Sequence, residues 1–521
     1  MWERFGFYGM QAVFYLYMIN ALTFDKTFAD LIYGNYTGMV YLTALIGGFL
    51  SDRYMGNRKS IITGGFTMAF GQLLLFTSGM LYTNKPVAAF FLYSGLIFLC
   101  LGNGFFKPNI SSMVGQLYPE NDKRIDSAFT IFYMGINIGG LMAPIICGFV
   151  GNTGNIADFK WGYFAAGVGM LLSLVIFIPL KNRYVVTPEG KPIGVMPPYR
   201  KSYDRNVTSL GIGNEGKSVP KEDFGNEEKR EELGNEGKYR GSDRSGGRNL
   251  IKYSGFFVIV FALFFFVLKS DIIGSFIFAT FFIAPLSIIL DKSLGKIEKQ
   301  KIIAMFLLIV FSMVFWIAFG EIGSSLTYFA DKQLDRSIFG WQMPPAVFQA
   351  FGPIFIISFA PILALVWSGL AKRKSEPSIP FKLAIGLFLI CIAYLILALA
   401  VKFLDPNVKT GMQWLVIMYF FLTLGELSLS PIGLSMMVKL APIRFGSMLM
   451  SVWFLSLGTS FKLSGVMSTF YPHDNIKPIF LGMQIATTYD FFMIFVVLTG
   501  LSSLILFFLI KPLLKLMNGV R

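Results

Sequence analysis

The 521-residue chain contains few of the side chains from which enzyme sites and covalent cross-links are built. Its three cysteines, Cys100, Cys147 and Cys391, lie far apart within apolar runs, and their spacing fits neither a metal site nor a disulfide framework. The only histidine, His473, stands in a turn, so we do not expect histidine to carry protons here. No nucleophile–base pair is evident in the sequence. These features favour neither an enzyme nor a protein that holds a metal or another cofactor.

Charge is also scarce. Only 14% of the residues are charged, whereas 54% are hydrophobic and 16% are aromatic, and the mean hydropathy is +0.61. A soluble core could not hide so much apolar surface, so the composition predicts an all-α polytopic membrane protein in contact with the lipid bilayer. The net charge of +15 does not require nucleic acid as a partner, because the basic residues fall mainly in short turns between apolar runs.

Apolar runs of about 20 residues, the length that crosses a bilayer core, occur fourteen times. They lie near residues 4–22, 31–51, 60–82, 87–115, 126–151, 161–180, 251–268, 272–290, 302–330, 347–371, 381–402, 412–440, 446–470 and 485–510. The turns rich in basic residues all fall on one side: Arg53, Arg58 and Lys59; Lys123 and Arg124; Lys292, Lys296, Lys299 and Lys301; Lys372, Arg373 and Lys374. The opposite turns hold isolated basic residues such as Lys26, Lys85 and Lys160. This bias predicts a protein of the cell (inner) membrane with both termini in the cytoplasm.

A polar stretch over residues 181–248 separates the first six runs from the other eight. It repeats Gly-Asn-Glu three times among lysine, glutamate, serine and glycine. So few apolar residues cannot offset the entropy of ordering, so we expect a solvated low-complexity loop. A docking or regulatory role for this loop is the alternative.

Charged residues at or within the apolar runs mark candidate sites, because each costs about 2.5 to 3.5 kcal/mol at the bilayer centre. Glu3 and Arg4 open the first run and predict a site in a watery or protein-lined cavity. The alternative is that both side chains reach the headgroups from the end of the span. Lys107 lies in the fourth run beside Pro108 and needs a carboxylate partner, which either a substrate or Glu3 would supply.

The remaining runs add further polar candidates. In the fifth run, Gly135 and Gly139 have the spacing of close helix packing, which leaves Asn137 as the inward-facing polar group. In the second half, Glu321 requires a proton or a cation if it is buried. Glu426 lies one helical turn before Ser430 and is placed to clamp an ammonium group.

These motifs resemble signatures of the proton-dependent oligopeptide transporter family, a branch of the major facilitator superfamily. The matching segments are Glu3-Arg4-Phe5 with Tyr8-Gly9-Met10, residues 47–59, which carry Asp52-Arg53 and Gly56-Asn57-Arg58, residues 102–109, 132–141, 315–331 and 425–433. The resemblance implies two six-helix bundles, here residues 1–180 and 291–521. Between them it implies a cytoplasmic loop at 181–250 and the additional helical hairpin of bacterial members at 251–290.

The residues and the resemblance together assign roles. Substrate contacts are expected from Arg4, Tyr8, Tyr41, Lys107, Asn137, Glu426, Ser430 and Trp453, proton coupling from Glu3 and Glu321, and gating from Asp52, Arg53, Arg58 and Asp331. For Trp453 considered alone, packing is the alternative. For the basic residues after the second run, a purely topological role is the alternative, although it leaves Asp52 and Gly56 unexplained.

The chain also departs from the family pattern. The first signature glutamate would fall before Met1, Gln11 stands where arginine is usual, and Gly352 stands where asparagine is usual. Gly320-Glu321 replaces an expected Glu-Gln pair. Because one residue along a helix turns a side chain by about 100°, Glu321 need not point where the family's acid points.

We therefore expect a proton-coupled symporter that imports di- and tripeptides by alternating access. Glu426 would hold the peptide ammonium, while Arg4 and Lys107 would hold its carboxylate. Protonation of Glu3 or Glu321 would release Arg4 or Lys107 from an internal pair. Two alternatives stay open: the same fold with another solute, such as nitrate, an amino acid or a drug-like compound, or a non-transporting membrane peptide sensor that signals through the polar loop.

The start of the chain raises a last expectation. At 1.5 Å per residue, residues 4–22 only just cover a core of about 30 Å, which would leave Glu3 and Arg4 at the membrane edge. An upstream segment ending in glutamate would restore the family signature. We therefore hypothesise that the sequence is truncated or begins at an internal methionine.

Overall fold

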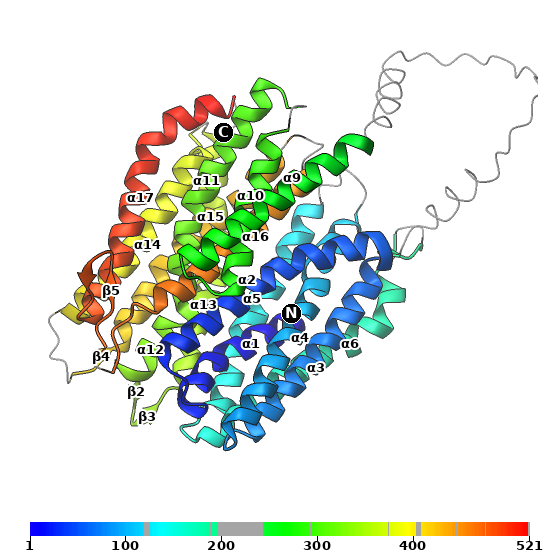
Figure 1. The fold of residues 1–521 in the computed structure, drawn as a ribbon. Helices are drawn as coiled ribbons and strands as arrows, with labels where there is room; N and C mark the ends of the chain where they lie inside the picture. The colour runs from blue at the N-terminus through cyan, green and yellow to red at the C-terminus, as the bar shows by residue number, and fades with distance from the viewer. Residues whose placement is uncertain are drawn as a thin grey trace, which may run out of the picture.

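The computed structural model describes residues 1–118, 124–187, 190–195, 243–291, 294–373, 375–402, 408–440, 442, 446–474 and 476–518. Most of these residues are helical, and the long helices run roughly side by side (Figure 1). Most of the polar loop expected at 181–250 lies outside the described residues.

Fourteen long helical segments occur in the described part of the chain, several of them extended by a short 3₁₀ or π-helical piece (η). They are α1 (Trp2–Leu16, then η1, Tyr17–Ala21), α2 (Lys26–Leu50, then η2, Ser51–Met55), α3 (Asn57–Met80), α4 (Lys85–Gly115), α5 (Arg124–Gly151), α6 (Phe159–Tyr184, after η3, Ile156–Asp158), α9 (Asp243–Ala262, then η5, Leu263–Val267), α10 (Ile272–Ile289), α11 (Lys296–Gly320, then η6, Glu321–Gly323, and α12, Ser325–Lys332), α13 (Phe351–Lys372, after η7, Pro345–Ala350), α14 (Ile379–Lys402), α15 (Met412–Leu440), α16 (Gly446–Ser468) and α17 (Thr488–Leu516).

Polar residues mark where several of these helices begin. Asp25 precedes α2 and accepts a hydrogen bond from the Phe28 amide at 3.2 Å. Thr487 and Asp490 form a reciprocal capping box at the start of α17. Because the first amides of a helix lack partners within the helix, such caps fix the residue at which an apolar run becomes helical.

The helices have the length and composition of membrane spans. In the described part of the chain, eleven helices are long and apolar enough to cross a bilayer. Tyr253–Val267 in the α9–η5 segment is a shorter apolar helix. The remaining two are α1, with 15 residues, and α2, which carries Lys26 and Asp30 in its first two turns. The prediction of an all-α polytopic membrane protein is confirmed.

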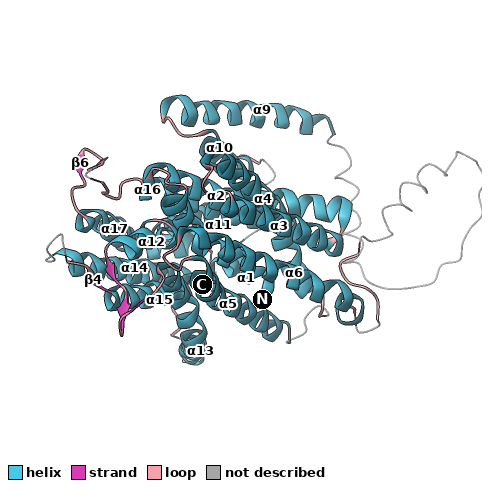
Figure 2. Cartoon of the chain, turned by 90° about the horizontal axis from the view of Figure 1, so that it is seen from below, coloured by secondary structure: helices cyan, strands magenta, loops and turns pink. Residues whose placement is uncertain are grey.

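The helices pack in two groups with a hairpin beside them. Helices α1 to α6 contact one another, and α11 to α17 form the second group. The hairpin of α9 and α10 stands outside both groups, with α10 against α2 and α16 and with α9 outermost (Figure 2). We call the groups the first and the second bundle.

The first residues after α6 are ordered, which differs from the expected solvated loop. Val186 bridges to Pro192, and Ile193 is buried. The Arg58 guanidinium of α3 donates hydrogen bonds to the carbonyl oxygens of Lys181, Val185 and Ile193. A basic side chain of the turn after α2 therefore holds this stretch against the first bundle.

Three short strand pairs lie in the connections at the end of the bundles where α2 begins. They are β1 (Leu334–Asp335) with β4 (Thr410–Gly411), which are parallel, and the antiparallel pairs β2 (Ser337–Ile338) with β3 (Trp341–Gln342) and β5 (Ile479–Phe480) with β6 (Met483–Gln484). The parallel pair ties the segment after α12 to the start of α15.

The two bundles meet closely along α2 and α16. A methyl group on Gly465 would lie 2.6 Å from the Cα atom of Gly34, and one on Gly458 would lie 2.9 Å from the Gly38 oxygen. Small residues allow this backbone contact, as they do in other membrane helix pairs. We call this contact the α2–α16 seam. The seam lies in the half of α2 that begins at Lys26, so the two bundles are in contact at that end.

We expect Gly465→Ala to destabilise the protein. The new methyl group would meet backbone atoms of both Gly34 and Asp30, at 2.6 and 2.7 Å, so the helices must separate. The matched control is Gly369→Ala in α13, where no atom lies within 4 Å of the added methyl group. The thermal midpoint of unfolding of the purified protein in detergent should fall for Gly465→Ala and hold or rise slightly for Gly369→Ala. Equal midpoints would show that the seam is not tightly packed.

Candidate substrate-binding site

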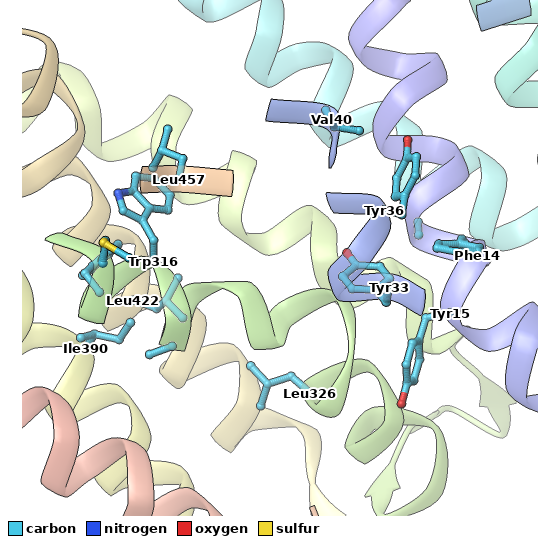
Figure 3. Close-up of a cluster of buried hydrophobic side chains, with 14 of the residues drawn as sticks. Phe14, Tyr15, Tyr33, Tyr36, Val40, Trp316, Leu326, Ile390, Leu422 and Leu457 are labelled. Atoms are coloured by element: carbon cyan, nitrogen blue, oxygen red, sulfur yellow. The ribbon is translucent and has the colours of Figure 1, made fainter. Parts of the chain in front are cut away.

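A cavity of about 260 Å³ lies between the two bundles. Its polar lining comes from Arg4, Tyr8, Gln11, Tyr33, Thr37, Tyr41, Lys107, Tyr133 and Asn137 in the first bundle and from Trp316, Gln349, Tyr419 and Glu426 in the second. Figure 3 shows Tyr33 and Tyr36 of α2 on one side, and Trp316 and Leu422 of the second bundle on the other. The volume is near the lower end of the range for small-ligand pockets, about 300 Å³, which favours a small solute.

The first bundle places two cations in the cavity wall. The Arg4 Nε atom lies 3.0 Å from a carboxylate oxygen of Glu3, and both residues are buried. The Lys107 ammonium lies 3.8 Å from the centre of the Tyr41 ring, a cation–π contact. No carboxylate among the described residues forms an ion pair with Lys107, so this cation faces the cavity without an anion of its own.

The second bundle places an acid in the opposite wall. Glu426 lines the cavity from α15, and among the described residues it makes no side-chain hydrogen bond or ion pair. A carboxylate without a partner in a half-buried position is poised to receive a cation. The cavity therefore has positive charge on one wall and negative charge on the other, an arrangement that complements a zwitterion.

Glu321 does not line the cavity. It is fully buried, one of its oxygens accepts a hydrogen bond from Ser464 at 2.9 Å, and the other accepts one from Ser325. Its neighbour Gly320 lines the cavity instead. The shift of the acid by one residue along the chain thus turns it away from the cavity, toward serines on α12 and α16.

Three departures from the family pattern gather at this cavity. Gln11, Gly320 and Gly352 all line it. Each replaces a larger or charged side chain that the resemblance led us to expect. Asn137 also lines the cavity, and its amide nitrogen donates to the Tyr133 carbonyl at 2.9 Å.

Two expected substrate contacts are not seen in the cavity wall. Trp453 is buried in α16 beside Gly433 of α15, where a methyl group would lie 2.2 Å from the indole ring. Trp453 is thus not among the residues that line the cavity in this structure, and the alternative of packing fits; its contact with a substrate stays a prediction. The Ser430 side chain lies outside the described residues, although its backbone belongs to α15.

The expected gating residues lie at opposite ends of the bundles. Asp52 and Arg53 are exposed in η2, and among the described residues no side chain pairs with Asp52. Asp331 lies at the end of α12, where its carboxylate is 3.1 Å from Lys332 and accepts a hydrogen bond from Asn20 of η1 at 3.2 Å. Of these residues, Asp331 is the one that joins the two bundles directly.

Sequence reasoning missed a buried charge cluster that also joins the bundles. Lys26, expected as an isolated basic residue in a turn, lies 2.7 Å from Asp30, and both side chains are at most 2% exposed. The Asp30 carboxylate also accepts hydrogen bonds from Tyr15 of α1 at 2.6 Å and from Ser468 of α16 at 2.9 Å. We call this set the Lys26–Asp30 cluster. The spacing of four residues was a signal for an ion pair on a helix, but not for its burial.

The start of α1, from Met1 to Arg4, packs against the middle of α5. A methyl group on Gly139, in the middle of α5, would lie 2.6 Å from the Met1 carbonyl oxygen. Glu3 and Arg4 consequently lie beside the central cavity and not at the edge of the bundle.

Two helical bundles that enclose a cavity of mixed charge define a solute transporter of the membrane. The sequence also identifies the family of this transporter, because the model of the POT family matches residues 58–196 and 279–484. The chain belongs to this family of proton-dependent oligopeptide transporters.

Relatives and solved structures agree with this assignment. The chain is 32% identical to an uncharacterized transporter, YclF, of Bacillus subtilis over 87% of this chain and 82% of the relative. It is 30% identical to a di-/tripeptide transporter of Lactococcus lactis subsp. lactis over 100% of this chain and 95% of the relative. A crystal structure of a peptide transporter POT in complex with alafosfalin is similar with a TM-score of 0.75 and 28% identity, over 99% of this chain and 94% of that one.

We expect Asp30→Asn to lower stability strongly, because it leaves the buried Lys26 ammonium without a carboxylate. Breaking one partner of a buried ion pair costs about 3 to 5 kcal/mol. Tyr15→Phe, which removes one hydrogen bond to Asp30, should cost only about 1 kcal/mol. Asp158→Asn, which alters a half-buried carboxylate bonded to the exposed Thr153, serves as the control. Thermal unfolding in detergent ranks the three variants, and a midpoint for Asp30→Asn equal to that of the control would contradict the role of the cluster.

Proposed function

We propose that the protein is a proton-coupled symporter that imports di- and tripeptides by alternating access. The observation that carries this proposal is the placement of Arg4 and Lys107 on one wall of the cavity and of Glu426 on the other. Free peptides carry an ammonium and a carboxylate at their two ends, so one molecule can satisfy both walls. The peptide transporters among the relatives support the same solute class.

In this mechanism the peptide joins the two bundles. Its ammonium binds Glu426 and its carboxylate binds Arg4 and Lys107, so the bound solute attracts the walls toward each other. A cavity that is closed at the α2–α16 seam must open there and close at its other end during the cycle. Because each opposite-charge contact is stronger when water is excluded, a peptide that meets both walls stabilises the occluded state.

The proton site that the geometry favours is Glu3. One of its oxygens is paired with Arg4, and its other oxygen is buried and has no hydrogen-bond partner among the described residues. A proton on that carboxyl group would weaken the pair and free Arg4 for the peptide carboxylate. Proton and peptide would then bias the same conformational equilibrium, which is the condition for coupling. Glu321 remains a second candidate, with serine hydroxyls as its partners.

The basic turns favour an orientation with both termini in the cytoplasm of the cell, in the inner membrane. In this orientation the α2–α16 seam closes the external side. Deletion of residues within 196–242 with uptake retained would count against the alternative of a peptide sensor that signals through this loop.

Another solute would make different use of the cavity. Nitrate offers no cation to Glu426, whereas a single amino acid has the two charges closer together than a peptide has. Competition for uptake by dialanine, alanine and nitrate separates these cases. Strong competition by dialanine alone supports the proposal, and stronger competition by nitrate would contradict it.

We expect Glu426→Gln to abolish binding of free peptides while N-acetylated peptides bind about as they do to the unaltered protein. The amide keeps the size of the side chain but cannot neutralise an ammonium, and charge-assisted hydrogen bonds contribute about 1.5 to 3 kcal/mol. Dialanine and N-acetyl-dialanine are compared in a binding titration on the purified protein. Equal losses for both would remove Glu426 from ammonium binding.

For Lys107→Ala we expect loss of proton-driven uptake, because one of the two cations for the peptide carboxylate is removed. Lys107→Arg retains the charge and should keep part of the activity, although arginine differs from lysine in shape. Uptake of dialanine into proteoliposomes under a pH gradient is the measurement. Unchanged uptake by the alanine variant would show that Lys107 has no part in the mechanism.

A further inference from the structure

The inserted hairpin contacts both bundles at the seam between them. We propose that this hairpin braces the α2–α16 seam, with Asp271 in its turn supplying the counter-charge for Lys462, which is buried between the bundles. The contacts between the hairpin and the seam do not depend on the transported solute. Only the expected effect on uptake rests on the proposed function.

Lys462 is a costly residue for its position. It lies in α16, its side chain is 0% exposed, and its ammonium donates a hydrogen bond to Asn35 of α2 at 2.6 Å. An amide oxygen cannot neutralise an ammonium, and an uncompensated buried charge is strongly destabilising. Among the described residues, the carboxylate that pairs with Lys462 is that of Asp271.

Asp271 comes from outside the two bundles and is held in place. It precedes α10, and one of its oxygens accepts a hydrogen bond from the Gly274 amide at 2.9 Å while the other faces Lys462. Burial alone would raise the pKa of Asp271, but the Lys462 ammonium and the Gly274 amide outweigh it and hold the pKa below the ordinary value.

The turn that carries Asp271 has a defined backbone. Lys269 adopts a left-handed conformation with φ of 52°, and the Ser270 amide donates to the Phe264 carbonyl at 3.0 Å. A lysine seldom adopts such a conformation without support from its surroundings. The carboxylate is therefore delivered to Lys462 by a fixed turn.

Apolar packing places the rest of the hairpin over the seam. Ile277 of α10 is fully buried, and its Cδ1 atom would lie 2.9 Å from a methyl group on Gly38 of α2. Ser275 and Ala279 are buried as well. Figure 2 shows α10 between α9 and the seam helices, so the hairpin lies on α2 and α16 together.

These contacts determine how the hairpin affects opening of the seam. Opening of the seam separates α2 from α16 and breaks the contact between Asn35 and Lys462. The pair of Asp271 and Lys462 keeps the hairpin attached to α16 and leaves the ammonium neutralised. Without the Asp271 charge, the closed seam must hold an unpaired ammonium, and the equilibrium shifts toward the open seam.

The test measures the seam directly in the purified full chain. Spin labels are attached to cysteines at two exposed positions, Phe28 on α2 and Lys477 after α16, in a variant without the three natural cysteines. Pulsed electron paramagnetic resonance then gives the distance distribution without any solute. Asp271→Asn removes the charge but keeps a residue that caps helices equally well. Asp25→Asn makes the same change at the cap of α2 and is the matched control.

We expect the ratio of short to long distances to fall by about tenfold or more for Asp271→Asn, together with reduced peptide uptake. The control should resemble the unaltered protein. The double variant Asp271→Asn with Lys462→Met removes both charges and should recover the short distances, because a buried pair is replaceable by apolar side chains. An unchanged distribution for Asp271→Asn, or a double variant as impaired as the single one, would overturn the proposal. Shifted distances in a protein that takes up no peptide would leave the brace standing and contradict the transport function.

Discussion

The need to neutralise charge inside a membrane protein organises this structure. Three buried cations each meet a carboxylate: Arg4 meets Glu3, Lys26 meets Asp30, and Lys462 meets Asp271. The second and third pairs also contact a residue from the other bundle, Ser468 or Asn35. Charges that would be costly within one bundle are thereby used to hold two bundles together.

The cavity is the exception to this rule. Lys107 lies over an aromatic ring, and Glu426 has no partner among the described residues. Unlike the three buried pairs, these two charges face a cavity and have no counter-charge among the described residues, which leaves them accessible to a solute. Gln11 and Gly352, which stand where the family pattern has arginine and asparagine, also line the cavity. They reduce the charge and the bulk of the lining, while the two oppositely charged walls are retained.

Much of this arrangement was predictable from the sequence. Apolar runs located the helices, because a span needs about 20 apolar residues wherever it occurs. The cost of a charge in such a run pointed to Arg4, Lys107 and Glu426, and all three line the cavity. Local composition and the resemblance were sufficient for these residues.

Other features depended on distances between elements, which a single sequence does not contain. Lys26 was assigned to a turn from the sequence. Its burial comes from the Ser468 carbonyl of α16, to which the ammonium donates, and from the rings of Tyr328 and Tyr471. Trp453 lies on the face of α16 that packs on Gly433. Because successive residues of a helix point about 100° apart, the sequence of α16 alone does not say which face meets α15. The pairing of Lys462 with Asp271 joins positions 191 residues apart.

The proposed transport mechanism depends on the direction in which a peptide lies between the two walls of the cavity. A structure of the protein with bound dialanine, determined by crystallography or cryo-electron microscopy, measures this directly. We predict the ammonium nitrogen within hydrogen-bonding distance of Glu426 and the carboxylate between Arg4 and Lys107. A peptide bound in the reverse direction, or bound without contact to these residues, would contradict the account.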